Sequence, residues 1–242
     1  MKRKDRMSFK RASNEMPNNK PIIFWDTCAL LDIIRIPFRD NFDINTLKSY
    51  MRLADLIEAG DVLSVTSSLV SIEFDNNYNK QIVDLRRSLN KVKQNTKEYA
   101  DYMQDRALGS TIKTTVDQLE VEQTFVDICD RITRNTVLIG SIKKIEKIAQ
   151  SRVIYKVVPA IDKGEYKDCF IWTTCVMLVH EIIPTSCTIF VTSNTRDYKD
   201  ANTNLPHQQL LDDCSTCNGL SIRFDINLAR IEFENALGLP HI

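Results

Sequence analysis

Two short apolar runs, each ending abruptly in oxygen-bearing side chains, constrain the fold of this chain most. Ile22–Trp25 stops at the carboxylate of Asp26, and Thr188–Val191 stops at the polar run Thr192–Asn194. Continuous apolar runs of this length are typical of strands that are buried on both faces of a parallel sheet. Because such sheets build their sites at the C-terminal strand ends, the two runs predict one shared, acid-lined site.

The charge balance gives no global signal for nucleic-acid binding. Lys and Arg together number 32 in the 242 residues, and Asp and Glu also number 32. Residues 1–20 hold seven basic and two acidic residues, a net charge of +5, which leaves −5 on the remaining 222. An acidic body fits a site that concentrates carboxylates and needs cations to balance them.

Membrane and secretion signals are missing from the sequence. No stretch approaches the 18 or more apolar residues of a membrane span, and no apolar segment follows the basic N-terminus. We therefore expect a cytoplasmic protein without membrane contact. The seven cysteines then indicate small buried side chains, because thiols stay reduced in that compartment. Cys214 and Cys217 have zinc-ligand spacing, but the second pair that a zinc site needs is missing.

The order of the apolar segments predicts an α/β chain. We expect residues 1–19 to be a disordered basic tail and residues 20–242 to form a single domain. The expected strands and helices alternate, which indicates a parallel, doubly wound sheet: strands at 22–26, 62–66, 188–192 and 220–225, and helices at 29–34, 46–60, from 68 onward, 167–181 and 227–237. Residues 81–151 look helical only, with breaks near 109–115 and 135–140, and indicate a helical insertion whose charges form a solvated face.

Five residues from four segments are the candidate site. Asp26 follows the first strand, Glu73 lies just past the first turn of a helix, and Asp168 lies in the first turn of another; Asn194 and Asp197 follow the late strand. Each has an ordinary structural explanation alone, such as a helix cap, a surface charge or a partner of the helix dipole. Their joint placement at one sheet edge favours a metal site.

Clustered carboxylates repel one another, and a divalent cation removes that cost. Mg²⁺ and Mn²⁺ prefer oxygen ligands, can activate a water, and can stabilise the leaving oxygen of a phosphodiester. The sequence offers no clear alternative chemistry, because it has no phosphate-binding glycine loop and no GxSxG motif. Its three histidines, His180, His207 and His241, also lack the spacing of zinc ligands.

Taken together, four segments resemble the PIN-domain nucleases: Phe24–Asp32, Ser68–Glu73, Lys167–Ile171 and Phe190–Tyr198. The resemblance covers roughly residues 21–79 and 156–225. It implies a three-layer α/β/α sandwich with a central parallel sheet, here with the helical insertion added. It also implies a ribonuclease that depends on Mg²⁺ or Mn²⁺ and hydrolyses RNA phosphodiester bonds internally.

The resemblance carries roles over to individual residues. Asp26, Glu73 and Asp168 match the core acids that hold the metal, and Asp197 completes the set. Asn194 stands where many members have Asp, which removes one negative charge. Thr27 and Thr192 match positions that orient the acids or a water. Two readings of Lys167 stay open, a contact to the scissile phosphate or an ordinary solvated helix start.

Small PIN proteins commonly act as toxins in toxin–antitoxin or antiphage defence systems, so the resemblance implies a protein inhibitor or defence partner, and a homodimer. Two alternatives stay open. One is a structure-specific DNA nuclease on the same scaffold. The other is a non-catalytic PIN-like module that binds RNA or protein, an alternative that Asn194 keeps open.

Overall fold

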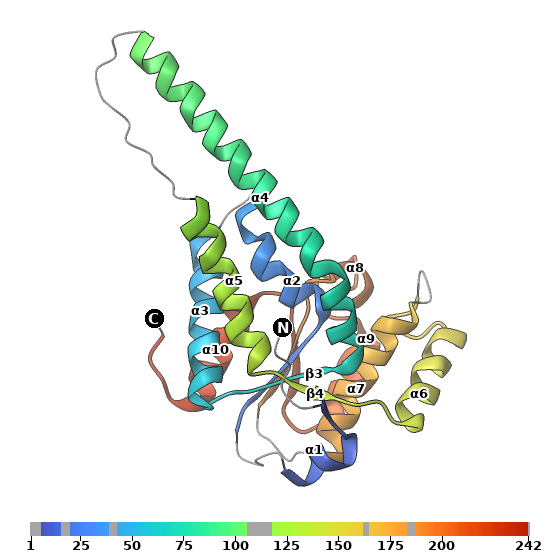
Figure 1. The fold of residues 1–242 in the computed structure, drawn as a ribbon. Helices are drawn as coiled ribbons and strands as arrows, with labels where there is room; N and C mark the ends of the chain where they lie inside the picture. The colour runs from blue at the N-terminus through green and yellow to red at the C-terminus, as the bar shows by residue number, and fades with distance from the viewer. Residues whose placement is uncertain are drawn as a thin grey trace.

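A parallel sheet of six strands forms the centre of the molecule (Figure 1). The computed structural model describes residues 6–15, 20–38, 43–105, 118–161, 165–182 and 187–241. Across the sheet the strands are β1 (Arg6–Met7), β4 (Val137–Ile139), β3 (Leu63–Ser67), β2 (Ile22–Trp25), β5 (Thr188–Val191) and β6 (Leu220–Arg223). Every neighbouring pair is parallel, which confirms the predicted α/β class and sheet type.

The apolar runs Ile22–Trp25 and Thr188–Val191 form the neighbouring inner strands β2 and β5. Every residue of β2 and of β5 is buried. Trp25 is in register with Thr66 of β3 and with Val191 of β5, so the three strands end side by side. Strands buried on both faces need a layer of helices on each side.

Helices cover both faces of the sheet and give the expected three layers (Figure 1). The first layer holds α2 (Thr27–Arg35), α3 (Ile44–Ala59), α5 (Gln118–Arg134) and α10 (Ile226–Leu237). The second holds α1 (Phe9–Glu15), α6 (Lys143–Ile154) and α7 (Tyr166–Ile182). The short elements are η1 (Ile36–Phe38), α8 (Thr195–Tyr198) and α9 (Gln208–Ser215). Gly60 ends α3 in the left-handed conformation, with φ 75°, as predicted for a helix-terminating glycine.

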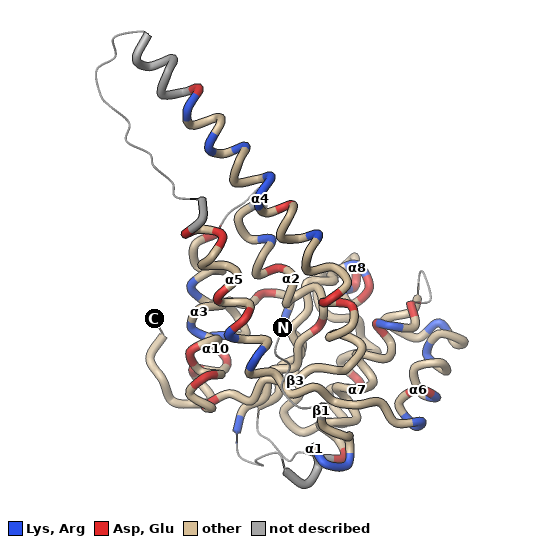
Figure 2. The backbone as a smooth tube through the Cα atoms, in the orientation of Figure 1, with Lys and Arg blue, Asp and Glu red and all other residues tan. Residues whose placement is uncertain are grey.

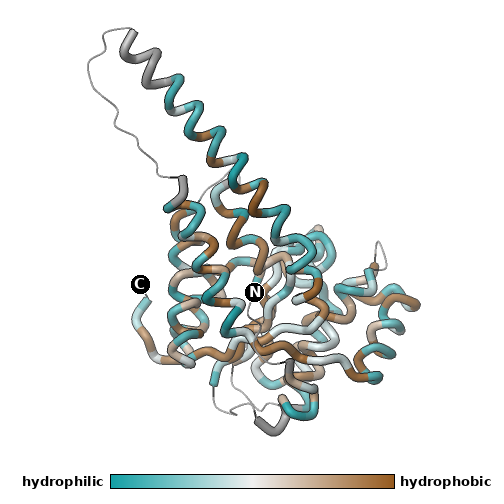
Figure 3. Tube along the Cα trace, viewed as in Figure 1, coloured by the Kyte–Doolittle hydropathy of each residue, from teal (hydrophilic) through white to brown (hydrophobic). Residues whose placement is uncertain are grey.

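Helix α4 (Ser68–Asp105) is the longest described element, with 38 residues and no Gly or Pro to interrupt it. It begins directly after β3, where the hydroxyl of Ser67 accepts a hydrogen bond from the amide of Val70 at 3.3 Å. Figure 1 shows that α4 continues well beyond the other elements. Its distal part is mostly hydrophilic (Figure 3).

Two expectations from the sequence are wrong in part. Residues 6–15 were expected to be disordered, yet they form β1, which pairs with β4, and α1, whose Phe9 and Ala12 are buried. Residues 1–5 and 16–19 of the expected tail lie outside the described residues. Residues 81–151 were expected to be helical only, yet β4 pairs with β3 inside the sheet. The expected break near 109–115 also lies outside the described residues.

Two further observations concern the helices and the cysteines. No helix in the described part of the chain is long and apolar enough to span a membrane. All seven cysteines are free thiols, including the pair Cys214 and Cys217.

Candidate active site

The order of the strands places the candidate site at the centre of the sheet. From β2 the chain moves outward through β3 and β4, then returns to build β5 and β6 on the other side of β2. Ligands of open parallel sheets bind at such a reversal, outside the C-terminal strand ends. Asp26 leaves β2 there, and the amide of Asp26 donates to the carbonyl of Val191 in β5 at 3.0 Å. The two strand ends are therefore joined directly.

Asp26 is a buried carboxylate, 3% exposed, with hydrogen-bond donors on both oxygens. Its Oδ1 accepts from the amide of Thr27 at 2.6 Å, which makes Asp26 the N-cap of α2. Its Oδ2 accepts from the hydroxyl of Thr192 at 2.5 Å and from the thiol of Cys28 at 2.9 Å. Burial raises the pKa of Asp26 above its ordinary value, although these three bonds act in the opposite direction. Asp26 is thus both a helix cap and a fixed acid at the strand end.

Glu73 connects three helices through its two oxygens. It lies in the second turn of α4, its Oε2 accepts from the hydroxyl of Thr27 in α2 at 2.8 Å, and its Oε1 meets Nζ of Lys167 in α7 at 2.9 Å. Glu73 also contributes to the raised pKa of Asp26. The carboxylates of Glu73 and Asp26 are therefore close enough to repel each other.

Asp168 and Asp197 complete the group of acids. Burial raises the pKa of Asp168 to about 7, and the charges of Asp26, Asp197 and Glu73 add to the rise. Asp197 is buried, and Arg196 donates to both of its carboxylate oxygens, at 3.1 and 2.9 Å.

Helix α8 is anchored against α7 by its last residue. The hydroxyl of Tyr198 donates to the backbone carbonyl of Asp168 at 3.2 Å. Its ring packs 5.5 Å from Phe190 of β5, measured between ring centroids. This anchor keeps Asp197 near Asp168, and Asp168 also interacts electrostatically with Asp26 and Glu73.

Asn194 is linked to the acids only indirectly in the described contacts. Its amide donates to Oγ1 of Thr192 at 3.0 Å, so its backbone belongs to the network around Asp26. Its side chain makes no cap hydrogen bond at the start of α8. The described contacts therefore connect Asn194 to the acids through Thr192 and its own backbone.

Cys28 is the contact that the sequence argument missed, since it was read there as a small buried residue. Besides donating to Asp26, its sulfur lies 3.3 Å from Oγ1 of Thr192 and accepts from the amide of Ser193 at 3.3 Å. Burial raises the pKa of Cys28 to about 12, and the Asp26 charge adds to the rise. The group therefore stays a thiol, and its only sequence signal is that it follows Asp26 by two residues.

The four carboxylates of Asp26, Glu73, Asp168 and Asp197 are chemically suited to bind a hard divalent cation. Among the residues that the structure describes, no three His, Cys, Asp or Glu side chains are grouped closely enough to hold one ion as they stand. Glu73 and Asp197 instead meet cations of the chain itself, Lys167 and Arg196. Four carboxylates that repel one another, with oxygen as the only donor atom, are nevertheless what Mg²⁺ and Mn²⁺ favour.

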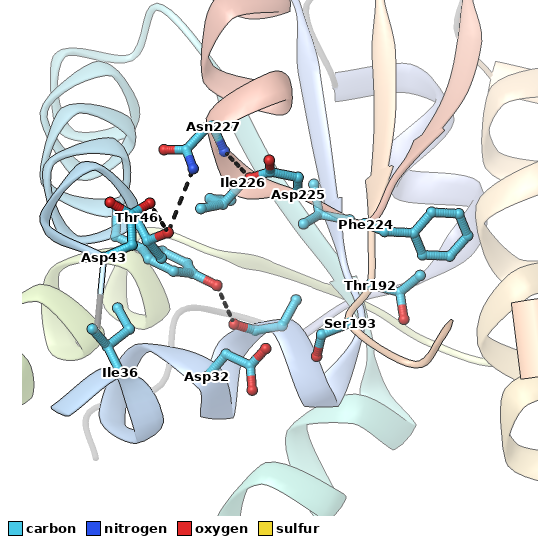
Figure 4. Close-up of a pocket in the computed structure, with 13 residues that line it drawn as sticks. Asp32, Ile36, Asp43, Thr46, Thr192, Ser193, Phe224, Asp225, Ile226 and Asn227 are labelled. Carbon is cyan, nitrogen blue, oxygen red and sulfur yellow. Dashed lines mark hydrogen bonds between the residues drawn. The ribbon is translucent and has the colours of Figure 1, made fainter. Parts of the chain in front are cut away.

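A cleft of about 300 Å³ lies beside this cluster and shares Thr192 and Ser193 with it (Figure 4). Its other walls come from α2 and from the starts of α3 and α10. Two acids of its lining, Asp43 and Asp225, are the N-caps of α3 and α10. A third, Asp32, has its Oδ1 3.6 Å from Nη1 of Arg35. Since these acids have structural partners, we assign the cleft no catalytic role.

Comparison with known proteins agrees with this geometry. A family model described as PIN domain matches residues 23–198, a range that includes β3, β4, β5, all but the first residue of β2, and the acids Asp26, Glu73, Asp168 and Asp197. No curated protein and no solved structure matches the chain. Because the matched range is most of the 242 residues, this chain belongs to the PIN-domain family.

Proposed function

We propose that this protein is a divalent-metal-dependent endoribonuclease. The observation that carries the proposal is the placement of Asp168 near three further acids: burial raises the pKa of Asp168 to about 7, and the charges of Asp26, Asp197 and Glu73 add to the rise. Such a group is costly unless a cation or protons balance it. PIN domains are generally nucleases, so a phosphodiester is the substrate class that this family suggests.

In the proposed mechanism Asp26, Glu73, Asp168 and Asp197 would hold Mg²⁺ or Mn²⁺. When bound, the cation would lower the pKa of an attacking water and offset the charge that builds on the phosphate. Asp26 is already oriented for this task by Thr192 and Cys28, and Glu73 by Thr27. The two threonines thus act as positioning residues.

Two cations lie at the mouth of the site and suit an anionic substrate. Lys167 and Arg196 have side chains that are 57% and 59% exposed, although each pairs with an acid of the cluster. A phosphate that approaches would meet these two side chains first. We propose that Asn194 contributes a neutral oxygen or amide group at the same edge, where a carboxylate would add further repulsion.

Cleavage of matched single-stranded RNA and DNA oligonucleotides tests the proposal. The wild type is assayed with Mg²⁺ or Mn²⁺ beside the Asp26→Asn variant, and each sample is repeated with EDTA. We expect internal cleavage of RNA that is lost on chelation. We expect at least a hundredfold loss in the variant, about the effect of removing one group that acts on the transition state.

The other outcomes separate the alternatives. Cleavage of DNA but not RNA would replace the proposal with a DNA nuclease. Binding of RNA without cleavage of either polymer by the metal-loaded wild type would favour a non-catalytic module. RNA cleavage that persists in EDTA would overturn metal dependence.

We further propose a toxin or antiphage defence role in the cytoplasm, with a protein inhibitor as partner and a homodimer as the assembly. The family supports the role, and the seven free thiols support a reducing compartment. Expression of the wild type should arrest growth, whereas Asp26→Asn at the same protein level should not. Equal toxicity of both proteins would contradict a toxin role that depends on cleavage.

A further inference from the structure

Part of α4 carries positive charge that has no partner among the residues that the structure describes. Residues 76–97 contain six basic residues and one acid, Asp84. Arg86 is held by Glu122, and Arg87 by Asp84 at 3.0 Å. The remaining four are exposed and have no hydrogen bond or ion pair to any residue that the structure describes: Lys80, Lys91, Lys93 and Lys97. Figure 2 shows these basic positions along α4.

Packing does not explain these lysines. Leu89 is the last buried residue among the described side chains of α4, and residues 90–98 are exposed except for the partly exposed Thr96. A helix that is polar on all sides has to be stabilised by pairs of side chains or by something that it binds. Lys80 has an acid four residues away, Asp84, but that acid pairs with Arg87, and Lys91 and Lys93 have no acid three or four residues away.

One row of these residues is aligned with the candidate active site. Residues seven or four apart on a helix lie on the same side, so one row holds Glu73, Lys80, Asp84, Arg87, Lys91 and Glu98. Asp84 pairs with Arg87, so the exposed lysines of the row are Lys80 and Lys91, with Arg87 between them. Lys167 lies at the start of that row, bonded to Glu73 at 2.9 Å. From Glu73 to Lys91 the row covers 18 residues, about 27 Å at the rise of an α-helix. Lys93 and Lys97 fall on the other side of α4.

The acid cluster needs such a row if its substrate is a polyanion. The chain has a net charge of zero, so no overall field attracts a nucleic acid. Close to the site the carboxylates would repel a phosphate. Cations that follow the strand away from the scissile phosphate offset this repulsion without occupying the site. Single-stranded nucleic acids bind in this manner, with cations tracking the backbone.

We propose that Lys80, Arg87 and Lys91 bind phosphates of an RNA strand whose scissile phosphate lies at the acid cluster. The inference rests on the proposed function and deepens it, because it makes the substrate an RNA that extends several nucleotides along α4. Lysines and arginines that contact phosphates do not read base sequence. The row therefore selects substrates by length and leaves their sequence unrestricted.

Two matched double variants of α4 test the row. Lys80→Gln/Lys91→Gln removes two exposed lysines from the row, whereas Lys93→Gln/Lys97→Gln removes two exposed lysines from the other side. Arg87 is left unchanged because it pairs with Asp84. The kcat/KM of each protein is measured against salt with single-stranded RNAs of about 4 and about 16 nucleotides, the range of typical single-strand sites.

We expect the row variant to lose kcat/KM on the longer RNA only. A plot of log(kcat/KM) against log salt has a negative slope, and each lost phosphate contact makes that slope less negative by about 0.7. The row variant loses two contacts, so its slope should be less negative than that of the wild type by about 1.4. Lys93→Gln/Lys97→Gln should match the wild type with both RNAs. Equal salt slopes for the two variants, or a kcat/KM of the row variant equal to that of the wild type, would overturn the assignment. An acidic protein would then be the better candidate for the partner of these lysines.

Binding of the same RNAs, measured by fluorescence anisotropy, separates the two proposals. If the wild type cleaves RNA and the two variants do not differ, only the row fails. If the wild type cleaves nothing with metal present, the proposed function fails. In that case the salt dependence of binding to the longer RNA tests the row: the row is supported if the two variants differ in slope as described above, and it is refuted if they do not.

Discussion

Thr192 joins the two central strand ends through one hydroxyl. Its Oγ1 donates to Oδ2 of Asp26 at 2.5 Å and accepts from the amide of Asn194 at 3.0 Å. Thr192→Val keeps the shape of the side chain and removes both bonds. Groups that orient metal ligands typically contribute 10- to 100-fold, so we expect kcat to fall by about that factor while KM for RNA is unchanged.

Thr174→Val is the matched control for this change. Thr174 is also buried, and its hydroxyl donates only to the carbonyl of Phe170 within α7. The control should keep the kcat of the wild type. An equal loss in both variants, or a Thr192→Val protein with unchanged kcat, would contradict a positioning role for Thr192.

Cys28 should act as a hydrogen-bond donor and not as a reactive thiol. Burial raises its pKa to about 12, so a thiolate fraction of only about 10⁻⁵ is expected at pH 7. Cys28→Ser keeps a donor to Asp26 and should retain most RNA cleavage, whereas Cys28→Ala should lose about tenfold. Iodoacetamide should leave the activity of the wild type intact. Rapid inactivation that Cys28→Ser abolishes would show a thiolate instead.

The position of the candidate acids near one sheet edge was predictable from the sequence for a specific reason. Strand ends in a parallel sheet meet at one edge, so Asp26 and Asp197 could be placed together from two apolar runs alone. The thiol contact of Cys28 was not predictable, because it depends on how the first turn of α2 faces the end of β5. The choice of Lys167 as the partner of Glu73 likewise depends on the relative position of α4 and α7.

At the scale of elements, the N-terminal segment is the clearest departure from the sequence pattern. Residues 6–15 are polar and basic and lack periodicity, so tertiary contacts and not local preference form β1 and α1. Strand β4 was missed for a related reason, since three residues are too few for a periodic pattern. Helix α4 was predicted from residue 68 onward, and the absence of Gly and Pro explains its continuation to Asp105.

Phe9 should anchor α1 to the body. It is 5% exposed, and α1 packs against α7. Replacement of a buried Phe by Ala typically costs about 3–5 kcal/mol, so Phe9→Ala should lower the free energy of unfolding by about 3 kcal/mol in urea denaturation. Leu228→Ala is the control, since Leu228 is 53% exposed on α10 and should cost less than about 1 kcal/mol. An unchanged free energy for Phe9→Ala would mean that α1 is not docked in solution.

At the scale of the whole molecule, the acid cluster makes the metal-free protein sensitive to pH. The pKa of Asp168 is about 7 in the folded state, against an ordinary value of 3.8. A raised carboxyl pKa contributes stability that is complete below 3.8 and is lost as the pH rises through 7. Between about pH 5 and about pH 7.5 the melting temperature of the metal-free wild type should therefore fall relative to that of Asp168→Asn. Parallel curves for the two proteins would contradict this.

Titration of the protein with Mn²⁺ by isothermal calorimetry tests the central claim, that the four acids form a cation site, most directly. Because Asp168 has a pKa of about 7, binding at pH 7 should release about half a proton, which buffers of different ionisation enthalpy reveal. We expect the wild type to bind Mn²⁺ with this proton release, and Asp168→Asn to bind far more weakly and to lose the share of the release that comes from Asp168. Absence of Mn²⁺ binding to the wild type, or identical binding and proton release in the variant, would contradict the account.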